Sequence, residues 1–289
     1  MRWVELFAGI GGARAALPPG HSVVQAIDHD EACHRVYTAA WGGHAQRLNL
    51  ASVRARQLAE ADAWWLSPPC QPYTVRGKRR DLDDPRAASL VHLLDLVADV
   101  RPRALAMENV PGFARSRAHR RVREVLEGAG YHVHERTLCP STLGVPMRRP
   151  RWYLVADQRP LSVPVEPPMA PPRPLAEVLD PAPAADLWAP SELVERYRGR
   201  LAVVDPDEPG ATAHVFTGAY GNSPVYAGSW LATPTGPRLF SPREILRLLG
   251  FGDAVRLEGL SRRKAYKLVG NSLSVDAVRQ VLSPWAAGV

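Results

Sequence analysis

Cys70 stands in a setting that is unusual for a cysteine that only fills space in a core. It follows the apolar run Ala63–Leu66 and the dipeptide Pro68-Pro69. Two prolines restrict the backbone ahead of the thiol and predict a rigid turn that holds the sulfur in a defined, accessible position. Four cations follow, and their positive field favours the nucleophilic thiolate and would also hold phosphates. These cations are Arg76, Lys78, Arg79 and Arg80.

A carboxylate occupies the equivalent place after another apolar run. Glu108 and Asn109 directly follow the expected strand Ala104–Met107. Ligand sites in parallel sheets lie beyond the carboxyl ends of the strands, so Glu108 is placed to face Cys70 across such a crevice. A solvated loop acid is the alternative interpretation of Glu108 taken alone.

A glycine-rich loop joins the first expected strand to the first expected helix. Its glycines, in Gly9-Ile10-Gly11-Gly12, allow a tight turn and a close approach of the backbone to a ligand. Arg14 stands where the dinucleotide fingerprint has its third glycine, which argues against an NAD-linked oxidoreductase. Asp28, at the end of the second strand, is placed to accept two ribose hydroxyls. An ordinary strand–helix turn and a helix cap are the alternatives for these two features.

The segments that must position these residues alternate between strand-like and helix-like patterns. Short apolar runs predict strands, and apolar side chains three and four residues apart predict helices. The expected strands are Arg2–Phe7, Ser22–Ile27, Ala63–Leu66, Ala104–Met107, Tyr131–Thr137 and Trp152–Ala156, and the expected helices are Ala13–Leu17, Asp30–Trp41, Ala88–Val100 and Arg117–Glu127. This alternation predicts an α/β fold with a Rossmann-like, doubly wound and mostly parallel sheet.

The pattern changes in the second half of the chain. Ten prolines between Pro160 and Pro190 make regular structure unlikely there, and residues 191–230 are short and mixed. Ser241-Pro242-Arg243-Glu244 has the residues that begin a helix. Two further helices are expected over Ser261–Leu268 and Ser274–Leu282.

Composition narrows the class of protein. The 289 residues are 46% hydrophobic, which excludes a disordered chain, and no uncharged apolar run is long enough for a membrane span. The acidic residue Glu5 stands where a signal peptide needs an apolar stretch, so we expect a cytoplasmic protein. The net charge of +7 favours an anionic partner, above all nucleic acid. Arginine-rich proteins from GC-rich genomes can show the same charge balance without such a partner. Cys33 and Cys139 are expected to be packing residues, and no cysteine pair suggests a metal site.

Taken in chain order, these motifs resemble those of the cytosine carbon-5 methyltransferases, which use S-adenosyl-L-methionine. The resemblance implies a class I methyltransferase fold, with a catalytic domain of residues 1–160 and 261–289. Residues 161–260 are then a proline-rich linker and a small target-recognition domain. The implied cofactor-binding residues are Phe7, Ala8, Gly9, Gly11, Gly12, Asp28, His29, Asn49, Pro69, Asn271 and Ser272.

The same resemblance assigns the reacting groups. Pro69-Cys70-Gln71 resembles the nucleophile motif, Glu108-Asn109-Val110 the motif of the acid that engages the base, and Arg149 with Arg151 the arginines that hold the target nucleotide. The implied catalytic residues are therefore Cys70, Glu108, Arg149 and Arg151, and the implied substrate-binding residues are Gln71, Arg76, Lys78, Arg79 and Asn109.

These residue types suit the chemistry of the family. A thiolate that adds to carbon 6 of cytosine makes carbon 5 nucleophilic enough to take a methyl group from a sulfonium. Glu108 would stabilise the adduct through ring nitrogen 3, and no metal has a role. The base must leave its stack, or start unpaired, for both ring faces to be reached.

The motif wording is closest to the transfer-RNA-methylating branch of the family. Val215-Phe216-Thr217 departs from the Cys-Phe-Thr element of that branch, and a DNA-modifying enzyme with a short recognition site is the alternative. A homologue that binds nucleic acid without catalysing a reaction is a third, remote interpretation. We expect a monomer, since heptad repeats are absent. A basic stretch is expected to contact substrate phosphates; it comprises Arg115, Arg117, Arg120, Arg121 and Arg123.

Overall fold

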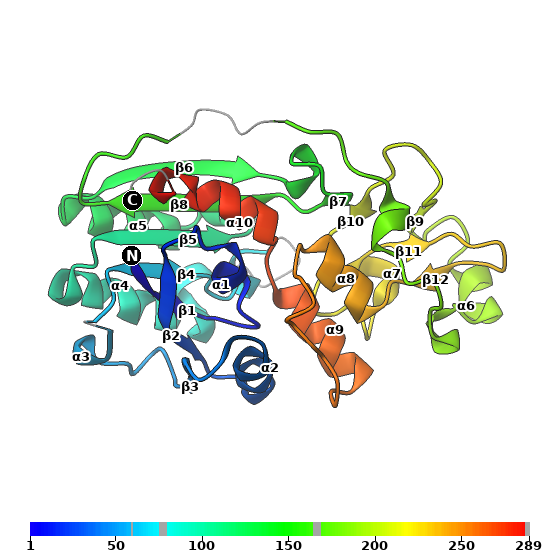
Figure 1. Ribbon diagram of the computed structural model, residues 1–289, viewed down its shortest axis with the longest axis horizontal. Coiled ribbons are helices and arrows are strands. Elements are labelled where there is room, and N and C mark those ends of the chain that lie inside the picture. Colours follow the sequence, from blue (N-terminus) through cyan, green and yellow to red (C-terminus); the bar gives the residue numbers. More distant parts are fainter. Residues whose placement is uncertain (59, 75–79, 164–168, 287–289) are drawn as a thin grey trace. The chain divides into compact units, whose positions relative to one another are not determined.

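The computed structural model describes residues 1–58, 60–74, 80–163 and 169–286, which divide into two compact units (Figure 1). The first unit is built from Met1–Leu138, Pro150–Glu166 and Val278–Val289, and the second from Cys139–Arg149 and Pro167–Ala277. Residues 261–277, which we expected in the catalytic domain, thus belong to the second unit. The assignment of catalytic and recognition roles to two domains stays a prediction.

A seven-stranded sheet forms the centre of the first unit (Figure 1). Its strand order is β3-β2-β1-β4-β5-β8-β6, and every strand runs in the same direction except β8. The strands are β1 (Arg2–Leu6), β2 (Ser22–Asp28), β3 (Ala45–Arg47), β4 (Ala63–Leu66), β5 (Ala104–Asn109), β6 (His132–Leu138) and β8 (Arg151–Asp157). The prediction of a doubly wound, mostly parallel sheet is confirmed.

Helices cover both faces of this sheet because its central strands are apolar on both sides. All four residues of β4 are buried, which is the pattern of a strand enclosed in a parallel sheet. Leu90, Leu93, Leu94 and Val97 form the buried stripe of α4, as their spacing predicted. The helices with residues in this unit are α1 (Gly12–Ala16), α2 (Glu31–Trp41), α3 (Ala55–Leu58), α4 (Ala88–Val100), α5 (Arg117–Gly128) and the end of α10 (Val275–Leu282).

The second unit consists of short elements. It contains a three-stranded sheet of order β12-β11-β9 and the parallel pair β10-β7. The strands are β7 (Met147–Arg148), β9 (Val203–Val204), β10 (Ala213–His214), β11 (Trp230–Leu231) and β12 (Arg238–Leu239). The helices wholly within it are α6 (Ser191–Arg196), α7 (Pro224–Ala227), α8 (Pro242–Leu248) and α9 (Arg262–Asn271).

A buried ion pair supports the start of α8. Ser241 and Glu244 form a capping box at the start of α8, where the sequence predicted that a helix begins. Glu244 also accepts hydrogen bonds from Arg238 at 2.7 and 2.9 Å, and both side chains are almost fully buried. Because the charges are paired and hydrogen-bonded, the unit tolerates them in its interior.

Candidate active site

Four loops with polar or reactive residues gather at one edge of the large sheet. They follow β2, β1, β4 and β5, which are neighbours and run parallel, so that their carboxyl ends lie side by side. Leu66 of β4 pairs with Met107 of β5, which sets the turn carrying Cys70 beside Glu108 and Asn109. This is the edge at which parallel α/β sheets bind ligands.

Asn109 ties two of these loops together. Its side chain is 1% exposed, and its Nδ2 donates a hydrogen bond of 3.2 Å to the carbonyl of Pro68. Its Oδ1 accepts from the backbone N–H of Val110 at 2.9 Å. Both ends of the amide are therefore used inside the protein, and the contact fixes the turn before Cys70 relative to the end of β5.

Glu108 forms an ion pair with Arg151. The distance from Arg151 Nε to Glu108 Oε1 is 3.1 Å, and both side chains are largely buried, with 14% and 12% of their surface exposed. Arg151 reaches this edge because β8 runs antiparallel to β5, which brings the first residue of β8 to the carboxyl end of β5. The pair holds the Glu108 carboxyl in place.

Cys70 is half-buried and immediately precedes a single 3-10 turn, Gln71–Tyr73. Its carbonyl accepts from the N–H of Tyr73 at 2.9 Å. The ring of Tyr73 meets the ring of Phe113 edge to face at a centroid distance of 4.8 Å. The turn is thus anchored by a buried aromatic residue three positions after the thiol.

Arg86 is a cation near Cys70 that the sequence did not single out as a site residue. It donates two hydrogen bonds to Asp84, of 2.8 and 2.7 Å. The pKa of Arg86 is raised, mainly by this contact with Asp84 and in smaller part by the charge of Cys70. Arg76, Lys78 and Arg79, the predicted cations, lie outside the described residues.

The glycine loop is held by the end of β2. The N–H of Gly9 donates to Asp28 Oδ2 at 2.9 Å, and the N–H of Asp30 donates to Oδ1 at 2.9 Å. Each carboxylate oxygen keeps a lone pair for a further donor. A shallow hollow is lined here by Ala8, Gly9, Asp28 and Tyr37, among others.

Gly11 has a steric reason to be glycine. Its φ is +88°, and a Cβ at this position would lie 2.2 Å from Nε1 of Trp41. Trp41 Nε1 itself donates to the carbonyl of Ile10 at 3.0 Å. The loop therefore lies directly against α2 at Gly11, whereas a Cβ at Gly9 would meet no atom within 4 Å.

Glu5 lies beneath this loop, and no sequence motif predicted a role for it in the site. It is 1% exposed, accepts from the N–H of Ala13 at 2.9 Å, and accepts from the hydroxyl of Tyr37 at 3.1 Å. Burial raises the pKa of Glu5 to about 7, against the opposing hydrogen bonds from Tyr37 and Ala13. The carboxyl joins β1, the start of α1 and α2 behind the glycines.

The other predicted residues of the first unit are more accessible. His29 has 84% of its side chain exposed and lies 3.5 Å from Asp28 Oδ1. Asn49 is exposed and caps its own turn by accepting from the N–H of Ala51 at 3.0 Å. Gln71 is exposed, Pro69 is half-buried, and Gly12 begins α1. Phe7 is half-buried with a φ of +59°.

Arg149, Asn271 and Ser272 belong to the second unit. Arg149 is 4% exposed, and its Nη1 donates to the carbonyl of Phe216 at 2.9 Å. Its Nη2 donates to the carbonyl of Ser272. Arg149 thus fastens the end of α9 to the segment around Phe216, whereas Arg151 pairs with Glu108 in the first unit.

Three arginines of the predicted basic stretch form ion pairs with acidic residues. Arg117 pairs with Asp83 at 2.6 Å, Arg121 with Asp95 at 3.3 Å, and Arg123 with Glu135 at 3.1 Å. Arg115 and Arg120 are exposed. Of the five arginines, these two have the charge most available to a polyanion, and contact with phosphates stays a prediction.

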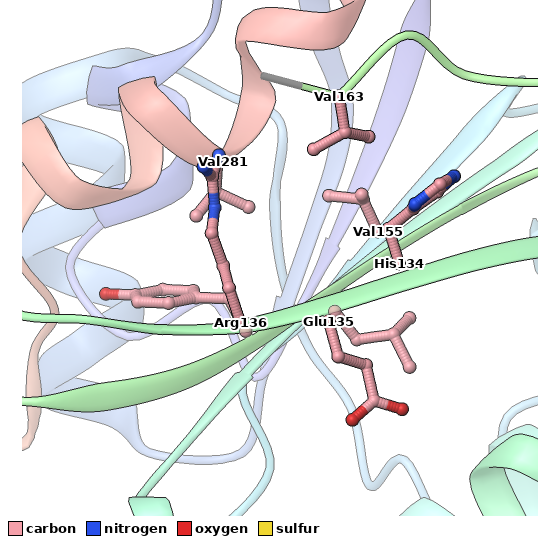
Figure 2. Close-up of a pocket in the computed structure, with 8 residues that line it drawn as sticks. His134, Glu135, Arg136, Val155, Val163 and Val281 are labelled. Atoms are coloured by element: carbon pink, nitrogen blue, oxygen red, sulfur yellow. The ribbon is translucent and has the colours of Figure 1, made fainter. Parts of the chain in front are cut away.

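A separate cavity of about 250 Å³ lies on β6 and β8, away from the predicted residues. Figure 2 shows Arg136 extending toward Val281, and Glu135 extending to the opposite side of its strand. Within the described ranges, no cluster of His, Cys, Asp and Glu could hold a metal ion. In the same part of the chain, every helix is too short or too polar to cross a membrane.

Comparison with known proteins identifies relatives along the whole chain. A family model described as C-5 cytosine-specific DNA methylase matches residues 1–180. A tRNA (cytosine(38)-C(5))-methyltransferase of Schizosaccharomyces pombe is 27% identical over 98% of this chain and 96% of its own length. The Homo sapiens protein of that name is 32% identical over 58% of this chain and 45% of its own length. The Type II methyltransferase M.HhaI of Haemophilus parahaemolyticus is 24% identical over 97% and 93%.

Solved structures agree with this relationship. The S. pombe Dnmt2 methyltransferase superposes with a TM-score of 0.87 and 26% identity, over 98% of this chain and 97% of that one. The Entamoeba histolytica methyltransferase EhMeth has a TM-score of 0.91 over the same shares. Its 24% identity makes that second likeness one of fold alone.

Proposed function

The chain belongs to the C-5 cytosine-specific DNA methylase family, and we propose that it methylates carbon 5 of cytosine in transfer RNA. S-adenosyl-L-methionine is the proposed methyl donor. One observation supports the proposal above others. The turn bearing Cys70 follows β4, and the acid Glu108 lies at the carboxyl end of the neighbouring parallel strand β5. The hydrogen bond between Asn109 and Pro68 joins the two.

Cys70 acts as the nucleophile in this proposal. Its thiolate adds to carbon 6 of an extruded cytosine, so that the electron density of the ring moves to carbon 5. Asn109 and Tyr73 keep the turn in one geometry during the attack. Once carbon 5 has taken the methyl group from the donor, loss of its proton to water would let the sulfur leave as a thiolate and would restore the aromatic ring.

Glu108 and Arg151 stabilise the charge that develops on the ring. Glu108 contacts ring nitrogen 3, and Arg151 holds its carboxyl through the 3.1 Å ion pair. Both side chains are largely buried, where electrostatic interactions are less screened than in water. Arg149 braces the second unit through backbone carbonyls.

The residues around the glycine loop suit the proposed cofactor, which supplies an electrophilic methyl group when bound. Ala8 and Gly9 line the hollow beside Asp28, and Gly9 has open space on its Cα. Asp28 offers remaining lone pairs to ribose hydroxyls. His29 is exposed beside it and is positioned to pack on a flat ring.

Transfer RNA is preferred over DNA as the substrate for two reasons. A relative named for tRNA methylation aligns over nearly all of both chains. The second unit also has only two-residue strands in its described part, which suits a folded substrate recognised by shape. DNA is the second candidate, because a Type II methyltransferase also aligns over nearly the whole chain.

The test is transfer of tritium from labelled S-adenosyl-L-methionine to bulk transfer RNA and to DNA in parallel reactions. We expect label in RNA, and none with Cys70→Ala. Cys33→Ala is the matched control, because Cys33 is buried in the first turn of α2 and is not one of the proposed reacting groups.

The outcomes separate the two parts of the proposal. If Cys70→Ala still transfers tritium to nucleic acid, and heat-denatured protein does not, then Cys70 is not the nucleophile. Label that enters DNA alone would overturn the choice of RNA and leave cytosine methylation intact.

A further inference from the structure

Gly112 comes very close to the turn that carries Cys70. It lies shortly after Glu108, in the 3-10 turn Pro111–Arg115 that follows β5. Although Gly112 is exposed, a Cβ built on it would lie 2.7 Å from the carbonyl oxygen of Tyr73. Real Cβ atoms essentially never come within 3.0 Å of such an atom, and this oxygen belongs to a backbone rather than to a flexible side chain. The two backbones can therefore lie this close only while position 112 has no side chain.

This approach is one of two contacts that hold the thiol-bearing turn, one on each side of the sulfur. Asn109 donates a hydrogen bond to the carbonyl of Pro68, which precedes the thiol in the chain. Gly112 lies against the carbonyl of Tyr73, which follows the thiol. Both contacts come from the stretch of chain that begins at Glu108. The same short stretch therefore carries the acid and sets the place of the turn.

The backbone around this glycine has little freedom to give way. The next residue, Phe113, is fully buried, and Asp81 accepts hydrogen bonds from the first two N–H groups of α5, a few residues further on. In the opposite turn, the N–H of Tyr73 is bonded to the carbonyl of Cys70 at 2.9 Å. A methyl group at position 112 would therefore push on the Tyr73 carbonyl, and this hydrogen bond would carry the displacement to the thiol.

We propose that Gly112 is a positioning residue for the methyl transfer, because the lack of a side chain there lets the Cys70 turn lie at its working distance from Glu108. The inference rests on the proposed function and adds a residue that acts through the Tyr73 backbone. A misplacement of about 1 Å between reacting groups can cost roughly 100-fold in rate. The φ of Gly112 lies outside the left-handed region, so the close approach, and not the backbone conformation, is what calls for glycine.

The first experiment measures steady-state methylation of bulk transfer RNA by the full chain. Gly112→Ala should lower kcat about 10- to 100-fold and leave unchanged both the KM for RNA and the affinity for S-adenosylhomocysteine. Gly128→Ala is the matched control, because Gly128 is also exposed with a φ outside the left-handed region, and its Cβ would meet no atom within 4 Å. Rates are divided by the titrated S-adenosylhomocysteine sites, so that unfolded protein does not count as lost turnover.

A trapping reaction tests the thiol more directly. In transfer RNA transcripts made with 5-fluorocytosine, carbon 5 has no proton to lose after methyl transfer, so the sulfur stays bonded to carbon 6. With S-adenosyl-L-methionine present, the wild type and Gly128→Ala should form this covalent complex at equal rates. Gly112→Ala should form it more slowly, by the same factor as its loss of kcat. The complex is measured as a shifted band on a denaturing gel.

Three results would overturn the inference. One is that Gly112→Ala equals the wild type in kcat and in trapping rate. Another is a raised KM for RNA with an unchanged kcat, which would place Gly112 against the substrate instead. The third is a Gly112→Ala protein that binds no S-adenosylhomocysteine, which would make this glycine a requirement of folding. A wild type that methylates and traps no RNA would instead overturn the proposed function, which the other three results leave intact.

Discussion

Arg151 and Glu108 come together because one strand of the sheet is reversed. Glu108 is the penultimate residue of β5, and Arg151 is the first residue of the antiparallel strand β8. Had β8 run parallel to β5, Arg151 would lie at the far edge of the sheet. The 3.1 Å ion pair is thus a product of topology as much as of side-chain chemistry.

Replacement of Arg151 is expected to lower turnover. Arg151→Ala removes the group that holds Glu108, and kcat should fall roughly 100-fold, the loss typical when one buried electrostatic partner is removed. The kcat of Arg151→Lys should fall less, because lysine keeps the positive charge but lacks the planar guanidinium donor. Steady-state kinetics with labelled donor measure both. Arg2→Ala, which breaks an exposed pair with Glu60, is the control and should turn over normally.

Removal of the Asn109 amide should affect stability and activity together. Asn109→Ala leaves the buried carbonyl of Pro68 without this donor and should cost about 1–3 kcal/mol of unfolding free energy. The turn carrying Cys70 then loses its tie to β5, so kcat should also fall. Urea unfolding and kinetics give the two values. Asn222→Ala is an exposed control, and equal unfolding curves for both variants would contradict the proposed tie.

Glu5 should make stability depend on pH. Its pKa rises from an ordinary 4.5 to about 7 through burial. The folded protein therefore holds an extra proton between these values, and its stability should fall as pH rises from about 4.5 to 7, by about 3 kcal/mol. Glu5→Gln should flatten this slope in urea unfolding measured at several pH values. Glu60→Gln, at an exposed acid, should retain the slope.

Two glycines of the loop should respond differently to alanine. Gly11→Ala places a Cβ 2.2 Å from the Trp41 ring nitrogen and should cost more stability than Gly9→Ala. Gly9→Ala meets only the strain of a left-handed backbone, roughly 1–2 kcal/mol, yet its methyl group points into open space beside Asp28. Calorimetry with S-adenosylhomocysteine should therefore show weaker binding for Gly9→Ala despite its milder loss of stability. Unchanged affinity would place the ligand elsewhere.

Local patterns predicted most of the first unit. Helix α4 has the predicted bounds, because four leucine and valine positions at helical spacing lie between polar boundaries. Strand β3, Ala45–Arg47, was missed because it is a three-residue polar edge with no alternation to detect. The direction of β8 was also beyond sequence patterns, since an apolar run reads the same in either direction.

Some features of the candidate site could likewise be predicted from local sequence patterns, and others could not. The positions of Cys70 after one strand and of Glu108 near the carboxyl end of another could be predicted from apolar runs that end in prolines or polar residues. Strand β5 nevertheless extends through Glu108 and Asn109, beyond its expected end at Met107. The roles of Glu5 and Arg86 could not be predicted, because each depends on contacts made only in the fold. Glu5 lies 32 positions from Tyr37 and looks like an acid that interrupts a strand. The pairing of Arg151 with Glu108 likewise spans residues that no local pattern connects.

The division of the chain limits how the second unit could be exchanged for that of a relative. The backbone passes between the units at 138/139, 149/150, 166/167 and 277/278. The short excursion Cys139–Arg149 supplies β7, which pairs with β10 from the later segment. A chimera that grafts only the longer segment from a relative would carry a foreign β10 against the resident β7. Exchange of the second unit therefore calls for transplanting both inserts as a matched set.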